Sequence, residues 1–127
     1  MKYLKKYKLF EDNLSDELEL EIAELCYNQL AYLFDDSGFK YNISSEDDYT
    51  VLELDYDDED ADIYGFDWHF VKDEIIPFIE ILDDKYNLME IQFYCEGGNE
   101  YHNVDDVLND FDIDGVMSIH FLIKHKN

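Results

Sequence analysis

Residues 15 to 35 carry the longest repeat of positions at helical spacing, which runs through Leu18, Ile22, Leu25, Cys26, Gln29 and Leu33. Ser15 can cap the first turn, and the acidic residues Asp16 and Glu17 of that turn favour a helix start. Gly38 follows the repeat, and glycine commonly ends helices. The pattern therefore predicts a helix over residues 15–35.

Three runs with the alternation of β-strands follow this helix. The first covers residues 39–43 and the second covers residues 52–56, each with large apolar side chains at every other position. The third places Tyr64, Phe66, Trp68 and Phe70 on one face. Three strands in succession predict an antiparallel meander.

The second half of the chain returns to helical spacing and then to alternation. A second amphipathic helix is predicted by Ile75, Phe78, Ile79, Leu82 and Tyr86. Pro77, the only proline of the chain, is expected near the first turn of this helix, where a missing N–H group is tolerated best.

Shorter elements complete the chain. A strand with Met89, Ile91, Phe93 and Cys95 on one face leads to a turn at 97–99, and Tyr101 begins a short return strand. Residues 104–111 predict a short third helix, residues 117–123 a final strand, and Tyr3–Phe10 an additional N-terminal strand. We expect one α+β domain over residues 1–127, with an antiparallel or mixed sheet of about five strands packed by two main helices and one short helix.

The charge of the chain excludes several functions. All 33 acidic residues lie between Glu11 and Asp114, where only three lysines occur, and the chain contains no arginine. Because arginine is the usual bidentate ligand of phosphate groups, we do not expect direct binding of nucleic acid or nucleotides. A net charge of −24 should instead attract basic surfaces. The 46% of hydrophobic residues argue for a folded protein in spite of this charge.

The lengths of the apolar segments indicate a protein without a membrane span, and the spacing of the cysteines indicates free thiols. No run of 18 or more apolar residues occurs, so we expect a soluble cytoplasmic protein, either a monomer or a homodimer. Cys26 and Cys95 lie in apolar patterns without the close spacing of redox or zinc motifs. We expect two free thiols in the core, with a disulfide as the alternative.

Two clusters of carboxylates are the candidate partner-binding residues. On the first predicted helix, Glu17, Glu21 and Glu24 form a row, and no lysine of that helix relieves their repulsion. The second cluster lies in the predicted connection after the second strand and comprises Asp55, Asp57, Asp58, Glu59, Asp60 and Asp62. Such rows can act as surrogates for the phosphate groups of nucleic acid.

With these two clusters and no arginine, the chain resembles, as a class, the small DNA-mimic inhibitors that phages use against restriction and CRISPR nucleases. The predicted order of a helix, three strands and a helix across residues 15–86 is also similar to that of small prophage-encoded inhibitors that block the PAM-reading site of a CRISPR nuclease. Acidic immunity proteins, which cover the basic active site of a toxin nuclease, resemble the chain in charge and size.

Other motifs carry weaker signals. Residues 110–115 match the first six positions of a calcium loop of the EF-hand type, which makes Asp110, Asp112 and Asp114 candidate metal ligands. The twelfth position is Phe121, where a bidentate Glu is required, and the intervening residues alternate like a strand. The histidines lack helical metal spacing and the serines lack the context of a nucleophile. We therefore expect no catalytic residues, no cofactor and no enzymatic activity.

The sequence favours an inhibitor that mimics nucleic acid and blocks the basic groove of a nuclease such as a CRISPR effector or a restriction enzyme. An immunity protein against a toxin nuclease is one alternative. A non-inhibitory acidic interaction module, which could respond to calcium, is another. General adaptation to a salt-rich cytoplasm would explain the same charge without any partner.

Overall fold

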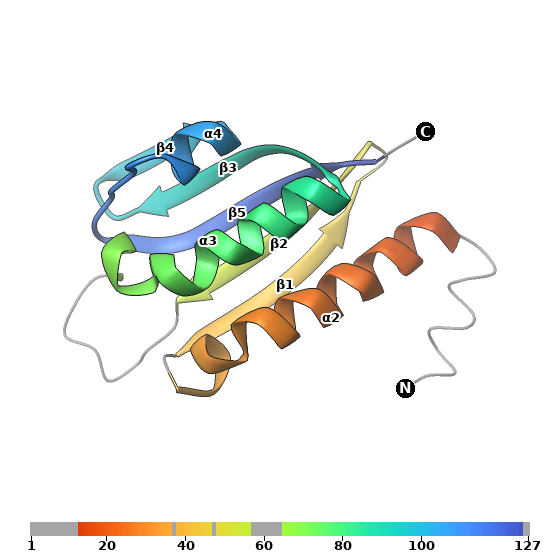
Figure 1. The fold of residues 1–127 in the computed structure, drawn as a ribbon, viewed down its shortest axis with the longest axis horizontal. Helices are drawn as coiled ribbons and strands as arrows, with labels where there is room; N and C mark the ends of the chain where they lie inside the picture. Colours follow the sequence, from red (N-terminus) through yellow and green to blue (C-terminus); the bar gives the residue numbers. More distant parts are fainter. Residues whose placement is uncertain (1–12, 37, 47, 57–64, 126–127) are drawn as a thin grey trace.

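The computed structural model describes residues 13–36, 38–46, 48–56 and 65–125, which form one α+β unit (Figure 1). The elements, in chain order, are α2 (Asn13–Asp36), β1 (Phe39–Ser45), β2 (Tyr49–Tyr56), α3 (Trp68–Lys85), β3 (Asn87–Cys95), β4 (Gly98–His102), α4 (Val104–Leu108) and β5 (Val116–Lys124). The expected α+β class, with two main helices, one short helix and about five strands, is confirmed. The strand predicted within Tyr3–Phe10 lies outside the described residues.

One antiparallel sheet contains all five of these strands, in the order β1-β2-β5-β3-β4. The last strand of the chain, β5, lies at the centre and pairs with β2 on one side and with β3 on the other. Because β2 and β3 are both antiparallel to β5, they run in the same direction as each other. β2, α3 and β3 therefore form a split β-α-β unit with β5 inserted between the two strands.

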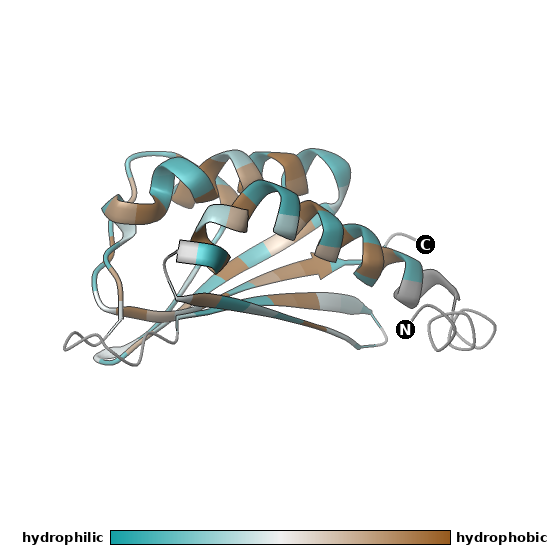
Figure 2. Ribbon diagram, turned by 90° about the horizontal axis from the view of Figure 1, so that it is seen from below, coloured by the Kyte–Doolittle hydropathy of each residue, from teal (hydrophilic) through white to brown (hydrophobic). Residues whose placement is uncertain are grey.

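The three helices lie on the same side of the sheet (Figure 2), and the hydrophobic core fills the space between the helices and the sheet. The sheet contributes alternate residues of its central strands to this core, among them Leu54, Phe93 and Phe121. The first helix contributes Ile22, Cys26 and Leu33, as predicted, together with Leu30, whereas Gln29 is exposed. No described helix covers the other side of the sheet, which we call the open face.

The predicted third strand is wrong. Phe66 forms only a single bridge with Val116, and α3 begins at Trp68. Trp68 and Val71 extend the helical repeat of buried residues backwards from Ile75, and Trp68 is almost fully buried beneath this helix. Trp68 and Phe70 therefore belong to the first turn of a helix, and Tyr64 lies outside the described residues. The meander predicted from three successive strands is wrong for the same reason.

This earlier start also changes the position of Pro77. We expected it in the first turn of the second helix, but it lies in the interior of α3. A proline there removes the hydrogen bond that the carbonyl group of Asp73 would accept. Both residues are exposed, so water can take the place of the missing donor.

A β-bulge alters the predicted face of the strand that became β3. The register shifts between Leu88 and Glu90, so Met89 is an extra residue opposite β5. Leu88 and Ile91 both reach the core as a result, while Met89 is about half exposed. The prediction that Met89 shares a face with Ile91 and Phe93 was wrong because uniform alternation cannot anticipate a bulge.

None of the helices in the described part of the chain is both long and apolar enough to cross a membrane. The two cysteines are free thiols, as expected, and Cys26 is buried while Cys95 is half-buried. Burial raises the pKa of the Cys26 thiol to about 12. The pKa of Cys95 is also raised, mainly by burial and to a smaller extent by the negative charge of Glu100.

The bridge between Phe66 and Val116 requires glycine at position 65. Gly65 has a φ of +90°, and an added Cβ would lie 2.5 Å from the carbonyl oxygen of Val116. We expect Gly65→Ala to lower the free energy of unfolding by about 2 kcal/mol or more, because strain and steric conflict add. Urea denaturation would measure the change. Gly97→Ala is the control, since nothing lies near its added Cβ, and an equal loss in both variants would contradict the argument.

The different surroundings of the two thiols predict different reactivity. In the native protein, neutral iodoacetamide at pH 8 should alkylate Cys95 slowly and leave Cys26 unmodified, because the thiolate of Cys26 is both inaccessible and disfavoured. Mass spectrometry of the labelled chain would locate the modification. Cys95→Ser should leave a native protein without a reactive thiol, and rapid labelling of Cys26 in that variant would contradict the buried placement.

Candidate functional site

The predicted row of carboxylates on the first helix is exposed. Glu17, Glu21 and Glu24 all lie on the solvent side of α2. Glu21 also accepts a hydrogen bond of 3.0 Å from the hydroxyl group of Tyr86, at the end of α3. Burial, together with this hydrogen bond and the charge of Glu21, raises the pKa of Tyr86 to about 12. Glu17 and Glu24 are therefore the better candidates for a partner, since Glu21 already links two helices.

Of the second predicted cluster, the structure describes only Asp55. Asp57, Asp58, Glu59, Asp60 and Asp62 lie outside the described residues. Asp55 belongs to the end of β2 instead of a loop, and it accepts a hydrogen bond of 2.6 Å from Oγ of Ser118. Its side chain points to the open face, whereas α2 packs on the other side of the sheet. The structure thus places Asp55 and the helix row on opposite sides of the sheet.

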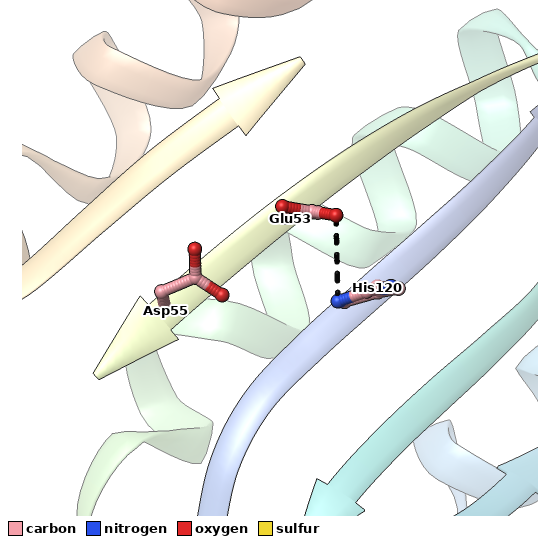
Figure 3. A group of neighbouring side chains, drawn as sticks. All are labelled: Glu53, Asp55 and His120. Carbon is pink, nitrogen blue, oxygen red and sulfur yellow. Dashed lines mark ion pairs between the residues drawn. The ribbon is translucent and has the colours of Figure 1, made fainter. Parts of the chain in front are cut away.

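Three ligand-type side chains meet on the open face (Figure 3). Glu53 and Asp55 come from β2 and His120 from β5, and the ligand atoms of the three lie within 4.8 Å of one another. Glu53 stands directly opposite His120 in the strand register, with 3.7 Å between Oε1 and Nε2. The ring of Tyr94 on β3 lies 4.3 Å from the imidazole ring, centroid to centroid.

The protonation of His120 reflects two opposing effects. Partial burial disfavours the imidazolium ion, while the negative charges of Glu53 and Asp55 favour it. Burial is the larger effect, so the pKa of His120 is lowered. The imidazole is consequently neutral at pH 7, and a neutral imidazole can accept a hydrogen bond or bind a metal ion.

Glu53 and His120 were not among the site residues that the sequence predicted. Sequence motifs for metal sites relate residues that are close in the chain, whereas this cluster forms across two strands that are far apart in the chain. The available signal was the alternation within each strand: Glu53 and Asp55 flank the apolar Leu54, and His120 lies between Ile119 and Phe121. This alternation puts each polar residue on the outer face but does not pair the strands.

A cavity of about 360 Å³ lies at the junction of α2, β1, β2 and α3. Its lining includes the aromatic side chains of Tyr32, Phe39, Tyr56, Phe66 and Phe70, and the carboxylates of Asp67 and Glu74. Phe70 and Tyr32, at 71% and 64%, are the most exposed large hydrophobic residues that the structure describes. Tyr56 and Gly65, which flank the segment bearing the acidic run 57–62, also line this cavity. Aromatic rings beside carboxylates are a surface that attracts organic cations.

The predicted calcium motif has a different setting from that of an EF-hand. Strand β5 begins directly after Gly115, whereas the helix of an EF-hand would follow the loop there. Oδ1 of Asp112 accepts a hydrogen bond of 3.0 Å from the N–H group of Ile113. Asp114 instead approaches Asp67 and His69, whose ligand atoms lie within 4.8 Å of its carboxylate. Calcium binding by Asp110, Asp112 and Asp114 stays a prediction.

Comparisons of the chain with protein-family models, with curated proteins and with solved structures found no match.

Proposed function

We propose that the protein is an inhibitor that mimics nucleic acid and occupies the basic groove of a nuclease, such as a CRISPR effector or a restriction enzyme. The observation that carries this proposal is the excess of 33 acidic over 9 basic residues, with no arginine. Self-repulsion of this size destabilises the compact state, so the charge is best explained by a use outside the fold. A densely basic groove is the partner that this charge complements.

The spacing of the α2 carboxylates supports mimicry. Four residues of a helix rise by about 6 Å, whereas one strand of duplex DNA carries a phosphate for roughly every 3.4 Å of axis. Glu17 and Glu24 are seven residues apart, a rise of about 10 Å, which matches roughly three phosphate intervals of a strand. Their rigid helix offers these charges without the ordering cost of a flexible chain.

The aromatic cavity supplies a second type of contact. An arginine side chain from the groove of the partner can place its guanidinium group against the rings of Tyr32 and Phe70 while Glu74 provides the opposite charge. A phosphate group offers charge alone, so this contact would give the inhibitor an apolar contribution that salt does not screen. An immunity protein against a toxin nuclease would use the same two contacts, and the origin of the target distinguishes it from a phage inhibitor.

The proposal is tested by finding the partner and measuring what binding does. Tagged protein should capture a nucleic-acid enzyme from a lysate of the source host and release it late in a salt gradient. The purified enzyme should then lose DNA or RNA binding in proportion to added inhibitor, and the association rate should fall steeply as salt rises. If the captured enzyme binds its nucleic acid equally well with the inhibitor present, mimicry is wrong.

The row on α2 can be tested without disturbing the fold. We expect Glu17→Lys combined with Glu24→Lys to weaken inhibition at least tenfold, because two attractive charges become repulsive. Glu21 is left in place, since it bonds to Tyr86. Inhibition constants would be compared with those of the charge-preserving pair Glu17→Asp and Glu24→Asp. An equal effect of both pairs, with unchanged circular dichroism, would exclude the helix row from the interface.

The cavity can be tested with a pair of neighbouring residues on α3. Glu74 lines the cavity and Asp73 does not, and Asp73 is exposed. Glu74→Gln should weaken binding of the partner about tenfold more than Asp73→Asn, although both remove one negative charge. Phe70→Ala should weaken binding further, and that loss should persist at high salt. Equal affinities of the Glu74→Gln and Asp73→Asn variants would mean that only overall charge matters.

A further inference from the structure

The centre of the open face holds a cluster that the inhibitory function does not need. Glu53 and Asp55 occupy alternate positions on β2, and His120 lies on the adjacent strand β5. Both strands lie in the interior of the sheet, so their backbone positions are held by hydrogen bonds on each side. The cluster is therefore built on the most rigid part of the fold.

Contacts with neighbouring residues hold two of these side chains in place. Oγ of Ser118 donates a hydrogen bond of 2.6 Å to Oδ1 of Asp55. The ring of Tyr94 packs 4.3 Å from the ring of His120 and limits its rotation. Supporting contacts of this kind orient the ligands of metal sites in proteins.

The negative charge of the cluster favours binding of a cation. Glu53 and Asp55 bring two carboxylates to the cluster. Lys40 on β1 stands opposite Asp55 and can offset that carboxylate, but the residue opposite Glu53 on β1 is the neutral Asn42. The side chains of His120 and Glu53 keep 21% and 28% of their surface exposed, so a hydrated ion can reach them.

The separation of the ligand atoms fits one metal ion. Two ligands at about 2.1 Å from a tetrahedral zinc ion lie roughly 3.4 Å from each other. Nε2 of His120 and Oε1 of Glu53 are 3.7 Å apart, and the Asp55 carboxylate lies within 4.8 Å of both. Small side-chain rotations would close these distances.

We propose that Glu53, Asp55 and His120 bind one divalent transition-metal ion, with zinc as the best match. One imidazole nitrogen and two carboxylate oxygens suit zinc or cobalt, whereas calcium and magnesium prefer sites built entirely from oxygen. Three protein ligands leave the fourth position to water. The ion would join β2 to β5 and lock the pairing on which the sheet depends.

The proposal is tested with full-length protein freed of metal by a chelator. Zinc would be titrated in competition with a chromophoric chelator, and cobalt would report the coordination geometry through its visible spectrum. We expect one equivalent to bind clearly more tightly than all others, and we expect this binding to raise the Tm. His120→Gln should weaken that equivalent at least tenfold and remove the cobalt spectrum, and Glu53→Gln should weaken it as well.

Matched histidine variants separate a specific site from the general attraction of cations to an acidic protein. On β4, Nε2 of His102 lies 2.9 Å from Oε1 of Glu100. The ligand atoms of His69, Asp67 and Asp114 also lie close together. Both histidines therefore have a carboxylate neighbour, as His120 does. His102→Gln and His69→Gln should leave the tight equivalent unchanged. The proposal is overturned if the unmodified protein shows only weak binding of many ions. It is also overturned if His120→Gln binds zinc as well as the other two variants do.

Discussion

The pairing of β5 with both β2 and β3 is the interaction on which the rest of the structure depends. Without β5 the sheet would be two separate hairpins, β1-β2 and β3-β4, and an isolated hairpin is marginally stable at best. Its buried residues include Ile119, Phe121 and Ile123, which belong to the hydrophobic core. Because β5 is the last strand of the chain, the core is completed only when this distant segment has paired.

This arrangement also explains how a chain of net charge −24 keeps a compact fold. The buried apolar residues form one layer between the sheet and the helices, and Thr50 is the only buried polar residue in the part of the chain that the structure describes. Carboxylates are thereby left on the outside of α2, along α3 and on the open face, where water reduces their repulsion. The same placement leaves these carboxylates at the surface, as the proposed binding to a basic groove requires.

The sequence predicted most helices and strands because each depends on a local repeat. The repeats of β1 and β2 have one period throughout, so these strands were placed correctly. Helix α2 and strand β5 were also placed correctly, although Leu30 departs from helical geometry and the register of β5 shifts between Val116 and Ser118. Errors arose where two periods overlap or one is interrupted. Taken without their neighbours, the aromatic residues Phe66, Trp68 and Phe70 alternate like a strand, but Trp68 is a buried residue of the helix α3. In β3, the bulge at Met89 interrupts the alternation of buried and exposed residues.

By itself the sequence determined the α+β class, the outward-facing row on α2 and the acidic character of the surface, because periodicity and charge are properties of local segments. It could not determine the strand order, the cavity between α2 and α3, or the meeting of Glu53 and Asp55 with His120. These features depend on which distant segments pack together. That choice is made by burial of the whole core, which no single segment of the chain specifies.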